Sequence, residues 1–313
     1  MSPSGSPATC QAYGLRLRPE LALPVALPRA AGPGPAVLIR LGDVRREPGA
    51  QAIWSTSIDG RAVVVDRGPS GSLGLRFGDE ASFRVEPDGW TITCAPRADA
   101  EPARWQRFLL DTVLWSAALV QGRVALHAAT IADGDGAVAI LGGTGAGKTS
   151  VAVALLRRGG ALVSDDVLVV SSGARGVCAH PAPPVMNLDA AADPDLRASV
   201  GRLLARLDDE DWICVHAPVP APVPLRAVVV LDRAHPGSQP ELHETPQDVL
   251  ALEARSISLP GLPRAYARTR FEVLADVAAR VPVLALSVPR SFTPDAIADV
   301  LRATLPATVR MVA

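Results

Sequence analysis

No other segment of the chain restricts its fold as strongly as the octapeptide Gly142-Gly-Thr-Gly-Ala-Gly147-Lys148-Thr149. It fits the pattern G-x-x-x-x-G-K-[ST] at every fixed position. An apolar segment, Ala137–Leu141, precedes it, and an apolar segment with helical spacing, Lys148–Arg158, follows it. The order predicts a strand, a glycine-rich turn and a helix in immediate succession, as in an α/β fold.

The residue types in this octapeptide suit the binding of phosphate groups. Glycines let the backbone curl so that successive N–H groups point at phosphate oxygens, and the start of the following helix adds partial positive charge. We predict a P-loop (the Walker A pattern), in which Lys148 reaches the β- and γ-phosphates and the Thr149 hydroxyl ligates Mg²⁺. The predicted nucleotide-binding residues are Gly142, Gly143, Thr144, Gly145, Ala146, Gly147, Lys148, Thr149 and Ser150.

The distribution of basic residues supports this prediction. The chain has 31 of them, and Lys148 is the single lysine beside 30 arginines. An ammonium group is a compact point charge, whereas a guanidinium group is a wide planar fork. A site that needs the compact group keeps lysine even in a chain that elsewhere uses arginine. Guanine-specific P-loop proteins read their base with an Asn/Thr-Lys-x-Asp motif, which needs a second lysine, so we predict that the nucleotide is ATP.

Two adjacent carboxylates follow the predicted P-loop. Asp165 and Asp166 come just after the predicted strand Ala161–Val163, where P-loop enzymes place a magnesium-binding carboxylate. We predict that Asp166 holds Mg²⁺ and that Asp165 accepts the proton of an attacking hydroxyl group. Neighbouring like charges raise one pKa, which favours a base, while the metal opposes that shift. A turn or a helix N-cap is the structural alternative for this pair.

One histidine, His127, lies in Leu126-His-Ala-Ala-Thr130, on a predicted strand that leads toward the P-loop. A histidine in a strand is more often a satisfied core residue than a catalytic one. The residues alone therefore leave a structural and a catalytic role open.

Four segments together resemble the catalytic domain of bacterial HPr kinase/phosphorylase: Leu126–Ile131, the P-loop, Leu155–Gly159 and Leu162–Asp166. The intervals agree as well, since Lys148 follows His127 by 21 positions and Asp165 follows Lys148 by 17. The resemblance implies that His127 assists near the reacting phosphate, that Asp165 is the general base and that Asp166 is a magnesium ligand. It also implies an α/β P-loop kinase domain related to phosphoenolpyruvate carboxykinases, ATP and Mg²⁺ as cofactors, and phosphorylation of a serine hydroxyl.

The resemblance is confined to these segments. Where the bifunctional enzymes carry an Arg-Gly-x-Gly-Ile segment, this chain has His180–Leu188, so the resemblance implies neither HPr as substrate nor the reverse phosphorylase activity. The β-rich N-terminal part, the proline-rich middle and the ending Val281–Pro289 are similar to HPr-kinase-like proteins encoded beside peptide natural-product genes. Some of those proteins phosphorylate a serine or the C-terminal region of a precursor peptide.

The chain divides into a β-rich domain, residues 1–104, and a P-loop domain, residues 105–313. In the first part, short apolar or alternating runs are separated by turn signals. A helix is predicted over Glu101–Val120, and strands and helices alternate after it. The Asp208–Asp211 run is predicted to be a solvated loop. The expected strands and helices are Ala36–Leu41, Ala62–Asp66, Leu73–Arg76, Ser82–Val85, Trp90–Cys94, Val124–Ala132, Ala137–Leu141, Val167–Val170, Leu225–Leu231, Val273–Ala279, Val281–Val288 and Pro294–Thr304.

Composition excludes several classes of protein. The net charge is −1 and aromatic residues make up 4%, so we expect no nucleic-acid partner. The apolar run Phe108–Val120 is interrupted by Asp111 and is too short to span a bilayer. The four cysteines form no C-x-x-C pair, and no signal peptide is visible. We predict a cytoplasmic protein with reduced thiols and no membrane partner; a homo-oligomer is compatible with the sequence.

The sequence predicts an ATP-dependent kinase that transfers the γ-phosphate to a hydroxyl group of a peptide, a protein or a small molecule. Two alternatives stay open. One is a P-loop ATPase, which releases phosphate without an acceptor. The other is a regulatory protein that binds the nucleotide without turnover. The segment Pro181–Asp211 is the part of the chain we expect to select the acceptor, which the sequence does not identify.

Overall fold

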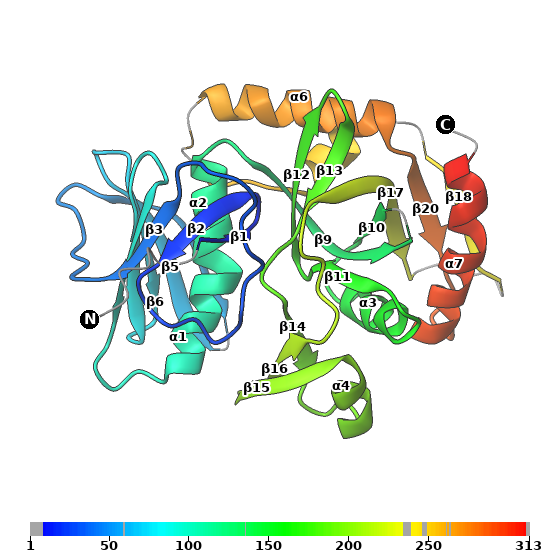
Figure 1. Ribbon diagram of the computed structural model, residues 1–313, viewed down its shortest axis with the longest axis horizontal. Helices are drawn as coiled ribbons and strands as arrows, with labels where there is room; N and C mark the ends of the chain where they lie inside the picture. The colour runs from blue at the N-terminus through cyan, green and yellow to red at the C-terminus, as the bar shows by residue number, and fades with distance from the viewer. Residues whose placement is uncertain are drawn as a thin grey trace.

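The computed structural model describes residues 9–58, 60–134, 136–233, 239–245, 249–260, 262 and 264–310. These residues are rich in strands, which form three sheets. Figure 1 shows an elongated molecule with the first sheet at one end, the second sheet toward the other, and the small third sheet projecting below them. Among the described residues, no helix combines the length and apolar character needed to cross a membrane.

The first sheet comes from the N-terminal region, whose predicted β-rich character is confirmed. Its buried and less buried side chains alternate, as at Leu73, Leu75 and Phe77, because successive residues of a strand face opposite sides of the sheet. Two neighbouring pairs are parallel and the others are antiparallel. In order, the strands are β1 (Cys10–Ala12), β2 (Leu15–Pro19), β3 (Val37–Leu41), β8 (Thr91–Pro96), β7 (Ala81–Val85), β6 (Leu73–Phe77), β5 (Arg61–Arg67) and β4 (Gln51–Ile58).

One long helix covers this sheet and carries a local irregularity. It consists of α1 (Pro102–Phe108), the π-helical turn η1 (Leu109–Val113) and α2 (Leu114–Val120). Its apolar face belongs to the same buried cluster as the first sheet, and the ring of Phe108 stacks on that of Phe77 with 4.5 Å between centroids. The predicted domain boundary between residues 104 and 105 falls inside α1.

The second sheet is mixed and closes partly on itself. The ring β9–β12–β13–β17–β10 returns to β9, which makes a small barrel. Among the strand pairs of the described residues in this sheet, β10–β17 and β17–β20 are parallel and the others are antiparallel. The predicted α/β domain is therefore confirmed in part: helices flank the sheet, but most of its strand pairs are antiparallel. The strands are β9 (Val124–Asp133), β10 (Gly136–Leu141), β11 (Ala161–Ser164), β12 (Val167–Gly173), β13 (Gly176–His180), β17 (Val223–Asp232), β18 (Glu241–Glu244), β19 (Ser256–Ile257) and β20 (Val283–Ser287).

Helices pack on two faces of this sheet. On one face, α3 (Lys148–Arg157) and α7 (Pro294–Arg310) share a core with Ile140 and Val229. On the other face, α6 (Arg264–Arg280) shares a core with Leu141. A short helix, α5 (Val249–Glu253), lies beside α6. Neighbouring residues of β10 thus serve opposite cores, as the alternation of side chains along a strand requires.

The third sheet arises from the segment between Pro181 and Val215. It contains β14 (Val185–Asp189), β16 (Glu210–Val215) and β15 (Gly201–Leu207), all antiparallel, with α4 (Pro194–Val200) beside them. The prediction that Asp208–Asp211 forms a solvated loop is confirmed for Asp208 and Asp209, which lie in an exposed turn, and is wrong for Glu210 and Asp211, which begin β16. Asp211 is fully buried, and Arg197 and Arg206 neutralise it. Asp208 pairs with arginines of the first sheet and α1.

Candidate active site

The glycine-rich loop, Gly142–Gly147, connects the end of β10 to the start of α3, as predicted. Gly145 and Gly147 have φ angles of 75° and 90°, in the left-handed region that suits glycine. Within the loop, the amide of Ala146 donates to the carbonyl of Gly143 (3.1 Å). The amides of Gly143, Thr144, Gly145 and Gly147 meet no acceptor among the described residues. A methyl group added at Gly143, Gly145 or Gly147 would meet nothing within 4 Å, so the loop borders open space.

Lys148 is the first residue of α3, and its side chain is 7% exposed. Its ammonium group donates to the carbonyls of Gly142 (3.2 Å) and Gly143 (3.3 Å). Burial lowers the pKa of this group, and the nearby charges of Asp166 and Asp165 oppose that shift. The chain's single lysine therefore sits beneath the glycine-rich loop, close to two carboxylates.

Asp165 and Asp166 interrupt what would otherwise be one strand. On both sides of the pair, β11 and β12 run antiparallel to β9, and β12 continues the register that Ser164 makes with Thr130, one residue shifted from that of Ala161 and Leu162. Between them, the N–H of Val167 donates to the carbonyl of Asp165 (2.7 Å), which makes a γ-turn centred on Asp166, whose φ is 63°. A positive φ is costly for a residue other than glycine and is often found at functional sites.

The Asp165 carboxyl group touches the start of α3. The hydroxyl of Thr149 donates to Oδ1 of Asp165 (3.2 Å), and the backbone amide of Asn187 donates to Oδ2 (3.4 Å). Burial raises the pKa of Asp165 well above its ordinary value, and the neighbouring charges of Asp166 and Asp111 add to the shift, while the two hydrogen bonds oppose it. Asp165 is therefore inclined to hold a proton.

Strand β9 brings the predicted segments together. Leu141, the last residue of β10, pairs with Ala128 on one edge of β9. On the other edge, the amide of Ala128 donates to the carbonyl of Asp166 (3.0 Å). His127 precedes Ala128, and its Nδ1 also lies 3.0 Å from the carbonyl of Asp166. Because a carbonyl oxygen only accepts, Nδ1 carries a proton, which leaves Nε2 as an acceptor in the neutral ring.

A cavity of about 180 Å³ borders the aspartate pair. Its polar lining includes Tyr13, Asp111 and Asn187, which belong to no sequence motif, together with Arg104 and Arg107 of α1. The one signal for these residues was Asp111, a charge inside an apolar helical run. Burial raises the pKa of Asp111 to about 7; Arg107 is the main opposing charge, Asp166 adds to the shift, and Asn187 opposes it.

Tyr13 reaches this cavity from the turn between β1 and β2. It has a φ of 53° and is 3% exposed, and its amide donates to the carbonyl of Pro181 (2.8 Å). Burial raises the pKa of its hydroxyl well above the ordinary value, and the charges of Asp111, Asp166 and Asp165 add to the shift. The phenol therefore stays neutral beside the carboxylates.

A second hollow, of about 480 Å³, borders the glycine-rich loop at Gly142 and Gly143. Its other lining residues include Asp232 and Ser287, the last residues of β17 and β20. The hollow therefore lies at the carboxyl ends of the parallel strands β10, β17 and β20, the usual place for ligands in sheets that have parallel strands.

Comparison with known proteins adds little to this geometry. No protein-family model matches the chain, and no curated protein matches it. Among solved structures, the chain is similar to the HPr(Ser) kinase/phosphatase from Coxiella burnetii, with 15% identity and a TM-score of 0.35, over 60% of this chain and 97% of that chain. Proteins of one fold score higher than this, so the chemistry of the site is inferred from its own residues.

Proposed function

We propose that the protein is a kinase that uses ATP and Mg²⁺ to phosphorylate a hydroxyl group. The observation that carries the proposal is the contact between Thr149, at the start of α3, and Asp165, in the aspartate pair (3.2 Å). This contact places a helix start, a buried lysine and two carboxylates around one point. A pure binding site needs the first two, whereas transfer to a hydroxyl group also needs a base.

The loop residues suit a triphosphate. Four loop amides meet no acceptor among the described residues, open space surrounds the glycines, and the Lys148 ammonium group lies beneath them. In the proposal, these amides and Lys148 hold the β- and γ-phosphates, and residues Thr144, Ala146 and Ser150 complete the cradle. The hollow of about 480 Å³ beside Gly142 and Gly143 gives room for the rest of the nucleotide.

The donor set also suits magnesium. Mg²⁺ prefers oxygen ligands, and the Thr149 hydroxyl and the Asp165 and Asp166 carboxylates supply them from adjoining elements. When bound, the metal neutralises charge on the phosphates. We assign the metal to Thr149 and Asp166, and we assign Asp165 as the general base because burial and Asp166 raise its pKa. His127, anchored on the carbonyl of Asp166, positions this turn near the reacting phosphate.

The test compares paired variants of the full chain by calorimetry with Mg·ATP and by transfer of labelled phosphate to a panel of hydroxyl compounds and serine peptides. Lys148→Ala should weaken binding at least about tenfold, which is about 1.4 kcal/mol. Lys148→Arg should also bind weakly, because a guanidinium group is too wide for the space beneath the loop. Asp165→Asn should keep the affinity for Mg·ATP and lower the transfer rate by about 10²–10⁴-fold.

The outcomes separate the alternatives. Asp166→Asn should instead weaken the magnesium dependence of binding. If Asp165→Asn weakens the magnesium dependence and Asp166→Asn does not, then Asp165 is the metal ligand and Asp166 is the base. The contact of Thr149 with Asp165 would allow this exchange of roles. Phosphate release without any acceptor would identify an ATPase. Full affinity for Mg·ATP in Lys148→Ala would overturn the proposal.

A further inference from the structure

We infer that the cavity beside Asp165 binds the phosphate acceptor, and that this acceptor is a small alcohol with further O–H or N–H donors and no anionic group. The inference rests on the proposed kinase function and names its substrate class. Polar residues that line this cavity are Tyr13, Arg104, Arg107, Asp111, Asp165, Asp166 and Asn187. We call it the acceptor cavity.

The position of the acceptor cavity fits an acceptor hydroxyl. Asp165 and Asp166 form part of its wall, and the Oδ1 atom of Asp165 accepts a hydrogen bond from the hydroxyl of Thr149, next to the glycine-rich loop. A hydroxyl group in the cavity would thus have the proposed base on the same side as the phosphate donor. In-line transfer requires the attacking oxygen to lie next to the γ-phosphate, with the base within reach of the hydroxyl proton.

Two residues that line the cavity have an acceptor atom without a hydrogen-bond partner. The Oδ2 atom of Asp111 and the Oδ1 atom of Asn187 are buried and have no hydrogen bond among the described residues. About a quarter of the Asp111 side chain is exposed, but Oδ2 is not, and the nearest cation, Nε of Arg107, lies 3.5 Å away. The amide oxygen of Asn187 only accepts hydrogen bonds, and the Asp111 oxygen accepts them whenever the carboxyl group is ionised. A buried acceptor without a partner is costly. A small turn of either side chain toward the cavity would let a hydroxyl or ammonium group of an acceptor satisfy it.

The charges around the cavity disfavour an anion. Three carboxyl groups line it, from Asp111, Asp165 and Asp166, beside two guanidinium groups. Both guanidinium groups already have carboxylate partners. Arg104 bonds to Glu101 and to Asp208, and Arg107 pairs with Glu210 and Asp111. A carboxylate or phosphate on the acceptor would therefore compete with those partners for the two arginines, and its charge would face the carboxyl groups of the lining.

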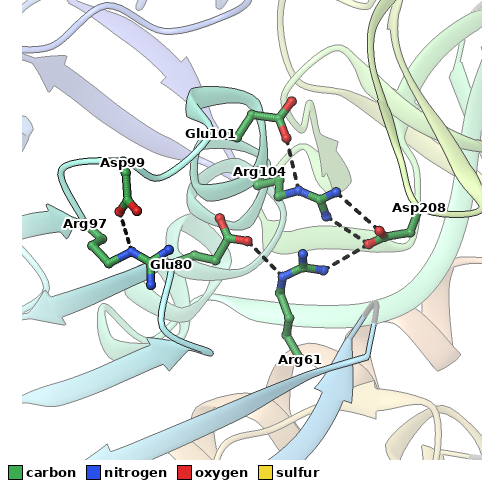
Figure 2. A network of polar contacts seen from close by, with 7 residues as sticks. All are labelled: Arg61, Glu80, Arg97, Asp99, Glu101, Arg104 and Asp208. Carbon is green, nitrogen blue, oxygen red and sulfur yellow. Dashed lines mark hydrogen bonds and ion pairs between the residues drawn. The ribbon is translucent and has the colours of Figure 1, made fainter.

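The size and closure of the cavity favour a small molecule. At about 180 Å³ the cavity is similar in size to cavities of about 150 Å³ that hold one benzene-sized molecule. Arg104 donates to both carboxylate oxygens of Asp208 (2.8 and 3.3 Å), which lies in the turn between β15 and β16 (Figure 2). This Arg104–Asp208 bridge ties the third sheet to α1 beside the cavity, whose lining includes both Arg104 and Leu207. The third sheet is thereby held beside a space that suits a small alcohol.

The test measures phosphate transfer by the full chain to uncharged polyols, to amino alcohols, to hydroxy acids of matched size and to serine peptides. Transfer should be fastest to the first two groups. Asp111→Asn and Asn187→Leu keep the shape of the side chains. Each should raise the KM for the acceptor about tenfold and leave the KM for ATP nearly unchanged. Asp79→Asn, an exposed change in the first sheet, is the matched control and should alter neither KM.

The possible failures are distinguishable. If the wild-type chain takes up no Mg·ATP, the proposed function fails and the acceptor assignment falls with it. If the chain transfers phosphate only to hydroxy acids or to peptides, or to none of the alcohols, the substrate class is overturned while nucleotide use stands. If alcohols are phosphorylated but neither cavity variant raises the acceptor KM above that of Asp79→Asn, the acceptor binds elsewhere. A thermal melt of each variant confirms that it is folded.

Discussion

The Asp111 carboxyl group stands in the π-helical turn η1, where burial raises its pKa to about 7 against Arg107, the main opposing charge. The π-turn is itself informative, because such turns are frequently found at functional sites. Here the turn lies in the helix that covers the first sheet, and Asp111 from this turn lines the acceptor cavity. Asp165 and Asp166, from the second sheet, line the same cavity.

This pKa has a measurable effect on stability. The folded chain binds the Asp111 proton more tightly than the unfolded chain, in which an aspartate titrates near about 3.9. The contribution of Asp111 to the free energy of unfolding is therefore fully present below about pH 4 and is lost as the pH rises to about 7. Asn does not titrate, so the Asp111→Asn variant does not lose this contribution. The free energy of unfolding of the variant minus that of wild type should therefore increase by about 2–4 kcal/mol between pH 4.5 and pH 8.

Urea unfolding at a series of pH values checks this prediction. Asp79→Asn, which is exposed, should follow the wild-type profile. A constant difference between Asp111→Asn and wild type across the pH range would mean that the carboxyl group titrates normally. The slope that remains in Asp111→Asn should reflect Asp165, whose pKa is raised by burial and by Asp166.

Some residues of the candidate site could be predicted from the sequence, and others could not. Lys148, Thr149 and the aspartate pair lie close together, as their spacing predicted, because a loop and two neighbouring strands fix them locally. Tyr13 and Asn187 could not be predicted, because only long-range packing brings them to Asp165. Asp111 was visible as a charge in an apolar helix, but its partners were not.

At the scale of elements, the strand, the glycine-rich loop and α3 follow the predicted boundaries closely, because turn residues and apolar periodicity are local signals. The predicted strands of the first sheet are found for the same reason. The third sheet was missed, because β15 and β16 carry charged residues and lie in a proline-rich part of the chain. The break between the predicted strands Ala161–Val163 and Val167–Val170 is found, but the γ-turn that makes it could not be predicted, since it depends on pairing with β9.

The glycine-rich loop permits a test of backbone strain that is separate from activity. Gly147 has a φ of 90° and Gly143 has no left-handed φ, while an added methyl group would meet nothing within 4 Å at either position. Gly147→Ala should therefore lower the free energy of unfolding by about 1–2 kcal/mol through strain alone. Gly143→Ala, the matched control, should be neutral or slightly stabilising by about 0.4–1 kcal/mol. Equal destabilisation of both variants in urea unfolding would show that the left-handed conformation at Gly147 is not required.

At the scale of the whole molecule, charged contacts join the first and third sheets. Asp208 accepts from Arg104 of α1 and from Arg61 of β5 (3.0 Å), and Arg61 also bonds to Glu80 (2.9 Å), as Figure 2 shows. Hydrogen bonds from these arginines lower the pKa of Asp208, with Arg104 the leading cause. The Arg104–Asp208 bridge is partly exposed, so its worth in global stability is at most about 1 kcal/mol.

The Arg104–Asp208 bridge should have a larger effect on local opening of the third sheet than on global stability. Asp208→Asn should speed amide hydrogen exchange in residues 201–215 several-fold and leave the melting temperature nearly unchanged, because the third sheet then opens more often without global unfolding. Asp209→Asn changes a neighbouring exposed aspartate that makes no side-chain contact among the described residues, and it should leave exchange unaltered. Equal exchange in the two variants would show that the bridge does not hold the third sheet in place.

The pairing of β9 on both edges has a consequence for how such a protein can change. The glycine-rich loop and the aspartate turn adjoin the same residue, Ala128, which is the register partner of Leu141 on one edge of β9 and donates its amide to the carbonyl of Asp166 on the other. This main-chain pairing does not depend on side-chain identity. The remaining walls of the acceptor cavity come from α1 and the π-turn, from the β1–β2 turn, from Phe77, and from the third sheet with the residues just before it, where side chains decide the lining. Recognition can therefore be rewritten by substitution in these outlying segments while the chemical machinery keeps its backbone, which makes them the natural targets for redesigning the acceptor.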